Sequence, residues 1–199
     1  MNLGETEIFY GAACFVLGLV VLSPTLIMVL ELPGGERFTE FWILGPGLMA
    51  QDYPYNVSEG SVHRIHLCVA NHLGDLQYYL IYLKFRNETE APSKAEDGTP
   101  SPLPPLSEYR VFLEDGQNKT EEIDMSFSGI TFEADTCTVQ SVSIGDQKVS
   151  LDKTATWNEE LSGYYFQLFF ELWSYNVSSN DFSFHNRTVW LWLNMTGRI

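Results

Sequence analysis

The sequence predicts an all-β protein, an antiparallel immunoglobulin-like β-sandwich preceded by one N-terminal transmembrane helix. Two observations lead to this class. An uncharged apolar run lies near the N-terminus, and the rest of the chain breaks into short apolar–polar alternating segments separated by turn residues. Regular short strands without an amphipathic helix are typical of sandwiches. The Cys-Trp-Cys pattern of true immunoglobulin domains is missing, so the prediction concerns the architecture alone.

The apolar run begins at Ile8, ends at Leu30 and holds no charged residue over 23 positions. A helix of that length extends about 34 Å, and a bilayer's hydrocarbon core is about 30 Å thick. We expect an uncleaved anchor rather than a signal peptide, because the flank MNLGETE has no cationic residue and no small-x-small motif follows the run. The chain therefore divides into residues 1–36, the anchor and its flanks, and residues 37–199, the sandwich.

The side of the membrane follows from the glycosylation sequons, Asn-x-Ser/Thr. All of them follow the apolar run, and they lie at Asn56, Asn87, Asn118, Asn176, Asn186 and Asn194. Such motifs are acceptors of N-linked glycans in extracytoplasmic domains. We therefore expect a single-pass protein of the cell membrane with residues 37–199 outside the cell. The alternative is polar turn chemistry in an internal protein.

The strands are expected where apolar and polar residues alternate. The segments are residues 37–44, 62–71, 76–86, 109–113, 122–132, 139–151, 164–175 and 182–195. Turn residues predict hairpins at positions 72–75, between 113 and 122, at 145–146 and at 176–181. Residues 91–106 hold five of the nine prolines and are expected to form an exposed loop.

Four motifs carry a resemblance to a known family. They are FTEFWILGPGLMAQDYPYNVSEG, VANHLG before a Tyr-rich strand, TWNEELSGYYFQLFFELW and HNRTVWLWLNMTG. Over residues 37–197 the chain resembles the archaeal, membrane-anchored family numbered 1616 among the domains of unknown function. The resemblance implies a surface protein with a sandwich outside the cell. It brings no activity and no catalytic residues, and larger members differ in having several membrane helices.

The composition excludes nucleic acid as a partner. Lys and Arg total 11 against 26 Asp and Glu, which gives a formal charge of −15. A protein that binds nucleic acid needs a cationic surface to displace the counterions of the phosphates. The acidic clusters match no alternating carboxylate loop for calcium, so a solvated acidic face is expected.

Cysteine and histidine are the candidates for a disulfide or a metal site. Cys68 and Cys137 are the only cysteines of the sandwich part, so one disulfide between them is a candidate in an oxidising compartment, although two cysteines have no spacing signature. The four histidines are His63, His66, His72 and His185. His63 and His66 are expected on opposite faces of one strand, and His72 in a turn, so no metal site, cofactor or catalytic group is predicted.

The aromatic pattern of the last two strands is the most informative feature. Alternation assigns Phe166, Leu168, Phe170, Val189, Leu191 and Leu193 to the core. The opposite face then carries Tyr165, Phe169, Trp173, Trp190 and Trp192. Such a patch marks a partner surface if it stays exposed. The alternative is that the long loop over residues 87–107 folds across it.

These observations predict a non-enzymatic surface glycoprotein. Its sandwich is expected to contact other membrane or surface subunits, or further copies of itself, in an envelope assembly or as an accessory subunit of a membrane complex. One alternative is an extracellular carbohydrate-binding module, because planar Trp and Tyr rings also stack on sugars. The other is a non-catalytic subunit of a membrane-bound metalloenzyme.

Overall fold

A computed structural model describes residues 3–30 and 36–197 of the chain. The chain divides into two compact units, Met1–Arg37 and Phe38–Ile199. The first contains helix α1 (Leu3–Leu30), which covers the expected span, although the side chains of residues 23–30 lie outside the described set. Among residues 3–30 and 36–197, no helix combines the length and the apolarity of a membrane span.

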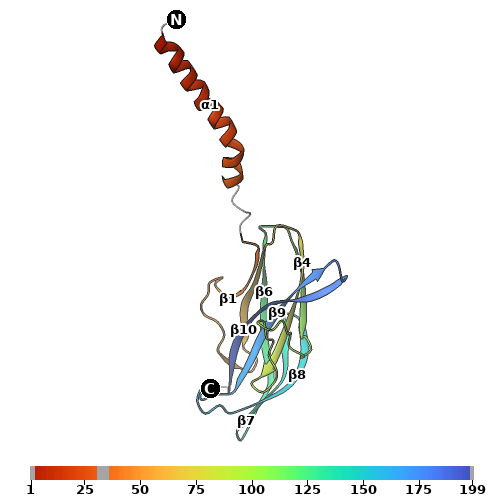
Figure 1. Cartoon of the computed structure of the whole chain (residues 1–199). Coiled ribbons are helices and arrows are strands. Elements are labelled where there is room, and N and C mark those ends of the chain that lie inside the picture. Colours follow the sequence, from red (N-terminus) through yellow and green to blue (C-terminus); the bar gives the residue numbers. More distant parts are fainter. Residues whose placement is uncertain (1–2, 31–35, 198–199) are drawn as a thin grey trace. The chain divides into compact units, whose positions relative to one another are not determined.

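The second unit is built from two five-stranded sheets (Figure 1). One sheet has the order β1-β3-β6-β7-β8, with β1 (Phe38–Leu44), β3 (Val62–His72), β6 (Asn118–Glu133), β7 (Thr136–Ile144) and β8 (Gln147–Thr156). The other has the order β2-β10-β9-β4-β5, with β2 (Asn56–Ser58), β10 (Asp181–Thr196), β9 (Tyr165–Asn176), β4 (Gln77–Asn87) and β5 (Ser107–Leu113). Every pairing is antiparallel except that of β2 with β10.

The two sheets enclose one apolar core, which confirms the β-sandwich. The largest fully buried side chains come from both sheets and include Phe127 of β6, Phe85 of β4 and Phe166 of β9. Alternation along β9 directs Phe166, Leu168 and Phe170 inward, as expected. Val189 and Leu191 of β10 are partly buried and pack against this core, and Leu193 lies within it. The mixed second sheet differs from the purely antiparallel sandwich predicted.

Two of the four expected hairpins are wrong. Strand β3 pairs with β1 and β6, whereas β4 pairs with β5 and β9, so the turn at 72–75 carries the chain from one sheet to the other. The segment between β5 and β6 does the same. Buried Asn71 joins the two crossovers, because its Nδ2 donates to the carbonyls of Asp75 at 2.7 Å and Leu113 at 3.0 Å. Local turn chemistry is equally compatible with a hairpin and with a crossover.

The other two hairpins are confirmed. Strands β7 and β8 meet around Gly145, whose φ of +55° is the left-handed conformation that such a turn requires. Strands β9 and β10 pair along most of their lengths, with one register shift between Phe184 and Arg187.

The end of the sandwich where β1 begins is called the proximal end, and the opposite end, where β9 begins, is called the distal end. Phe38 lies opposite His72 at the proximal end.

Candidate partner-binding site

The outer face of the β2-β10-β9-β4-β5 sheet carries the five aromatic residues expected to form a partner surface. Tyr165 and Phe169 are only 3% and 1% exposed, so these two assignments are wrong. Trp173 and Trp192 are half-buried, and Trp190 is 54% exposed. Of the five, Trp190 is therefore the one with a large free surface.

A strap formed by residues 88–106 covers the middle of this face. It holds the Pro-rich loop expected from the sequence, and its polar contacts hold it against the sheet. The backbone N–H of Ser101 donates to Glu171 Oε1 at 2.7 Å, and Lys84 Nζ donates to the Ser101 carbonyl at 2.7 Å. The hydroxyl of Ser101 donates to the Ala91 carbonyl at 2.8 Å. The alternative stated above, that this loop folds across the aromatic face, is correct for the part of the face that holds Phe169.

Beneath the strap lies a buried ion pair. Lys84 Nζ and Glu171 Oε2 are 2.8 Å apart, and their side chains are 5% and 0% exposed. A buried charge is tolerated only when it is paired and its remaining hydrogen-bonding capacity is met. The strap meets that need, because its Ser101 backbone supplies one donor to Glu171 and one acceptor to Lys84.

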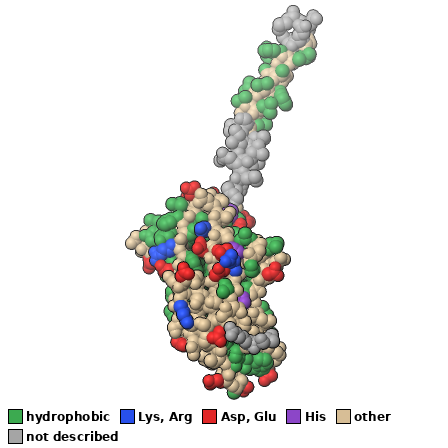
Figure 2. All heavy atoms as spheres, turned by 180° about the vertical axis from the view of Figure 1, so that it is seen from behind, with side chains coloured by type: hydrophobic (Ala, Val, Ile, Leu, Met, Phe, Trp, Pro, Cys, Tyr) green, Lys and Arg blue, Asp and Glu red, His purple; other side chains and the backbone are tan. Residues whose placement is uncertain are grey.

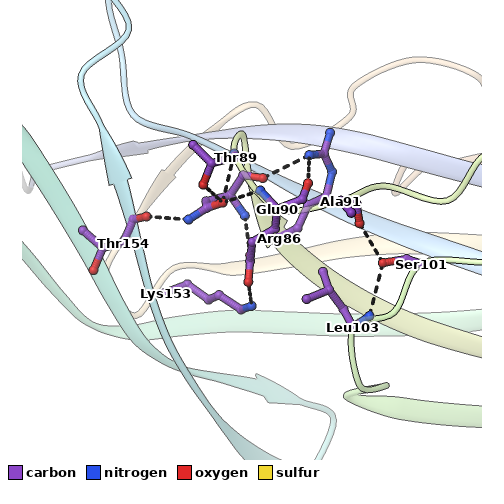
Figure 3. A network of polar contacts seen from close by, with 9 residues as sticks. Arg86, Thr89, Glu90, Ala91, Ser101, Leu103, Lys153 and Thr154 are labelled. Atoms are coloured by element: carbon purple, nitrogen blue, oxygen red, sulfur yellow. Dashed lines mark hydrogen bonds and ion pairs between the residues drawn. The ribbon is translucent and has the colours of Figure 1, made fainter.

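A second polar network anchors the start of the strap (Figure 3). Arg86 Nη1 donates to the carbonyl of Glu90 at 2.6 Å, and the Glu90 carboxylate forms an ion pair with Lys153 of β8. The Arg86 guanidinium lies 5.3 Å from the ring of Trp192, and its burial lowers the pKa of Arg86. Trp192 is thus engaged within its own chain, which leaves it little surface for a partner.

A pocket of about 360 Å³ lies beside the covered face, between β1, an edge strand of its sheet, and the part of β10 that β2 does not pair with. Its lining residues are Trp42 and Ile43 of β1, Tyr53 of the following loop, and Thr188, Val189, Trp190 and Leu191 of β10. Sequence reasoning found Trp190 but missed Trp42 and Tyr53. Their contribution depends on β1 lying next to β10, which no local pattern reveals.

The hydroxyl groups of this pocket are already engaged. Tyr53 donates to the Ile43 carbonyl at 2.8 Å, and the Thr188 hydroxyl is 2.9 Å from that of Ser93 in the strap. The remaining lining side chains are apolar or aromatic. The pocket is therefore suited to a largely apolar group, since a strongly polar ligand would lose water and find few hydrogen-bond partners in this lining.

The histidines are distributed over separate contacts. Nδ1 of His66 is 2.9 Å from the Gly45 carbonyl, His72 Nε2 is 3.2 Å from Glu40 Oε1, and His185 Nε2 is 2.9 Å from the Thr39 hydroxyl. His63 Nε2 is buried without a hydrogen-bond partner. Within residues 3–30 and 36–197, no three His, Cys, Asp or Glu side chains are grouped so that they could hold a metal ion.

The candidate disulfide is not formed, because Cys68 and Cys137 are both buried free thiols. Strands β3 and β7, which carry the two cysteines, lie on opposite sides of β6. Cys68 pairs with Thr120 of β6, and Cys137 pairs with Phe132 of β6. Twelve residues of strand separate those two positions, which is roughly 40 Å at about 3.3 Å per residue. A disulfide requires Cα atoms about 4.4–6.8 Å apart. Desolvation raises the pKa of Cys137 to about 12.

The six sequons fall into two groups. The Asn87 side chain donates to the Thr154 carbonyl at 2.8 Å and accepts from the backbone of Thr89 and Glu90. Asn194 accepts from Tyr164 N and donates to Asn56 Oδ1. Four exposed sequons have side-chain nitrogens without a hydrogen-bond partner among the described residues, and they are Asn56, Asn118, Asn176 and Asn186. The asparagines of this second group have amide nitrogens free to carry a glycan. The side chains of Asn87 and Asn194 instead hold strands and loops together.

These features define the class of protein, an all-β sandwich domain with a covered outer face and an apolar pocket at its open edge. The particular family follows from a sequence comparison. Residues 32–133, just over half of the chain, match the family described as Domain of unknown function (DUF1616), and the chain belongs to that family. This confirms the resemblance to that family over residues 32–133, which include the Trp42 segment of the pocket. A comparison with curated proteins finds no match.

Solved structures match the chain only at low similarity. A beta-glucosidase from Listeria innocua in complex with isofagomine is 14% identical over 82% of this chain, with a TM-score of 0.33. The same enzyme in complex with glucose is 14% identical over 80%, with a TM-score of 0.32. The chain spans 17% of the length of each of these structures. Similarity at this level carries no argument about function.

Proposed function

We propose that this protein is a non-enzymatic, membrane-anchored surface glycoprotein whose sandwich binds another protein subunit through the pocket between Trp42 and Trp190. The observation that carries the proposal is the pocket itself, which lies at the open edge of the sandwich and is lined by two tryptophans. Tryptophan is enriched at the centres of protein interfaces, where an exposed ring is buried on binding.

The anchor is supported by the sequence of residues 8–30. This stretch is uncharged over 23 residues, which is long enough for a tilted membrane helix. The placement of the sandwich outside the cell is supported by the exposed sequons with free side-chain nitrogens. Acceptor asparagines in an extracytoplasmic domain need this exposure because a glycan is bulky.

A protein partner is favoured over a carbohydrate by the chemistry of the pocket. Aromatic rings stack on sugars, but sugar recognition also needs side chains that hydrogen-bond the ring hydroxyls. The pocket's two hydroxyl side chains, Tyr53 and Thr188, already have partners within the chain. An apolar side chain from another polypeptide fits this lining without needing a hydrogen bond from either hydroxyl.

Site-specific photocrosslinking in native membranes tests the proposal. A photoreactive benzophenone side chain at position 190 should crosslink to a single polypeptide, identified by mass spectrometry. The matched control carries the same group at position 157, because Trp157 is 39% exposed and is absent from the pocket lining. Trp42→Ala should abolish the adduct from position 190.

Two results would contradict the proposal. Equal adducts from positions 190 and 157 would show that contact is not specific to the pocket. An adduct that contains only glycan would identify the carbohydrate-binding alternative instead. Because the thermal midpoint of each variant can be measured in parallel, loss of crosslinking through unfolding is distinguishable from loss of the interface.

A further inference from the structure

A second exposed apolar surface lies at the proximal end of the sandwich and is separate from the pocket. The tip patch, as we call it, consists of Leu76, Tyr78, Phe112, Tyr175, Val177 and Phe182. Leu76 and Phe112 are each 62% exposed, and Val177 is 83% exposed. Figure 2 shows hydrophobic side chains gathered at an upper corner of the sandwich.

The rings of the tip patch form an ordered cluster. Tyr78 of β4 stacks on Phe112 of β5 with centroids 3.9 Å apart, and its ring meets that of Phe182 edge-on at 4.9 Å. Tyr175 of β9 lies 5.4 Å from Phe182. Arg110 places its guanidinium 5.9 Å from the Phe182 centroid and donates to the Tyr78 hydroxyl at 3.4 Å. The patch thus presents aromatic rings with polar groups beside them, the combination found at membrane interfaces.

The connection to the proposed anchor limits what the tip patch can reach. Residues 31–37 separate Leu30 from the start of β1 at Phe38. Seven residues extend at most about 25 Å, whereas β6 alone, with 16 residues, spans about 54 Å at ~3.4 Å per residue. If a bilayer holds the anchor up to Leu30, the start of β1 therefore lies no more than about 25 Å from that residue. The tip patch belongs to the proximal end, since Tyr79, the neighbour of Tyr78, lies 3.0 Å from the Thr39 hydroxyl of β1.

We propose that the tip patch rests in the headgroup region of the membrane and orients the sandwich on it. This inference rests on the proposed anchor but not on the pocket. Aromatic and aliphatic side chains are stabilised when they move from water into the headgroup region of a membrane. Four acidic residues lie beside the patch in the sequence, namely Asp75, Glu114, Asp115 and Asp181. These carboxylates repel anionic lipids, so the tip patch fits a membrane surface of zwitterionic headgroups.

Depth-dependent fluorescence quenching in the full chain tests this contact. Cys14→Ala leaves the buried thiols of Cys68 and Cys137, and Val177→Cys then provides a labelling site within the patch. The matched control is Leu161→Cys, which is 59% exposed and lies near the distal start of β9. With nitrobenzoxadiazole labels in phosphatidylcholine vesicles that contain doxyl lipid, the label at 177 should be quenched about twofold and the label at 161 unquenched.

The patch itself must be responsible for the quenching. Replacing both Leu76 and Phe112 by Ser should reduce quenching at position 177 to the level at position 161. Exchanging half of the phosphatidylcholine for phosphatidylglycerol should also weaken it, because the acidic residues repel the anionic surface. Equal quenching at both positions, or quenching unaffected by the double replacement, would overturn the inference.

Failure of the anchor gives a different result. Chains that do not float with the vesicles would contradict the anchor and the tip contact together, whereas floating chains without quenching at position 177 would contradict the tip contact alone.

The inference also singles out one sequon, that of Asn176, the last residue of β9, which directly precedes Val177. A bulky glycan there would hold the patch away from lipid, so we expect Asn176 to be unmodified, and its modification in native material would overturn the inference.

Discussion

Lys84 of β4 and Glu171 of β9 form an ion pair of 2.8 Å beneath the strap, and both side chains are almost inaccessible to water. Their strands are neighbours in the sheet, where Tyr82 and Glu171 are opposite each other. Because Ser101 bonds to both partners, the pair fixes the middle of the strap to the sheet. The strap thus covers the centre of the aromatic face at Phe169, whereas Trp190 at its edge stays exposed.

The ion pair gives the first prediction. Lys84→Met should lower the free energy of unfolding by about 3–5 kcal/mol, because it leaves the Glu171 charge buried without its partner. Urea denaturation of the sandwich, which has its own core, measures the change. Lys119→Met is the control, since Lys119 pairs with Glu121 at the exposed surface and its loss should cost less than about 1 kcal/mol. Equal effects of the two changes would contradict the role given to the buried pair.

The covered aromatic face gives the second prediction. Phe169→Ala should destabilise the sandwich by about 3–5 kcal/mol, because the ring is buried beside the strap. Trp190→Ala should cost less than about 1 kcal/mol, since more than half of its surface is exposed. Thermal and urea unfolding of the two variants compare them directly. A large loss for Trp190→Ala would mean that this ring serves the fold rather than a partner.

The third prediction concerns the sequons. Asn87→Gln and Asn194→Gln should each cost about 1–3 kcal/mol, because their amides bond to backbone groups that would be left unsatisfied. Asn118→Gln and Asn186→Gln should change stability by less than about 0.5 kcal/mol. The same asparagines should differ in glycopeptide mass spectra of native material, with glycans on Asn118 and Asn186. If all six sequons are bare, the extracellular placement is contradicted.

The fourth prediction concerns the thiols. Cys68 and Cys137 should resist alkylation in the folded protein and react fully in denaturant without a reducing agent. Burial raises the pKa of both thiols, which suppresses the reactive thiolate. Intact mass after alkylation counts the modified thiols. A requirement for reductant would show a disulfide and would contradict the register of β3, β6 and β7.

The fifth prediction is a pH dependence. Burial lowers the pKa of both His63 and His185 below the ordinary value of 6.5, and nearby Arg187 lowers that of His185 further. The unfolded chain then binds more protons than the folded chain below about pH 6.5, so stability falls as the pH drops through that range. His63→Gln should flatten the loss measured by urea denaturation between about pH 7 and 5. If the free energy of unfolding falls equally steeply with pH in the variant, His63 does not contribute to the pH dependence.

Periodicity alone could predict the strands and the sandwich. Alternation in residues 164–175 assigns Phe166, Leu168 and Phe170 to the core, and the structure agrees. The motifs around Trp42 likewise carry the family. These features depend on neighbours in the sequence, because a strand turns successive side chains to opposite faces wherever it lies.

The tertiary structure decided which strands are neighbours, and with that the candidate site. Turn residues after His72 and Leu113 give no sign that the chain changes sheets there, and the spacing of Cys68 and Cys137 does not place them on either side of β6. Alternation correctly placed Phe169 on the outer face but could not show that Ser101 and the strap cover it. Trp42 and Trp190 meet at one pocket although 147 residues separate them along the sequence. Such contacts arise from the packing of the whole chain, whereas a local pattern specifies only which face a side chain occupies.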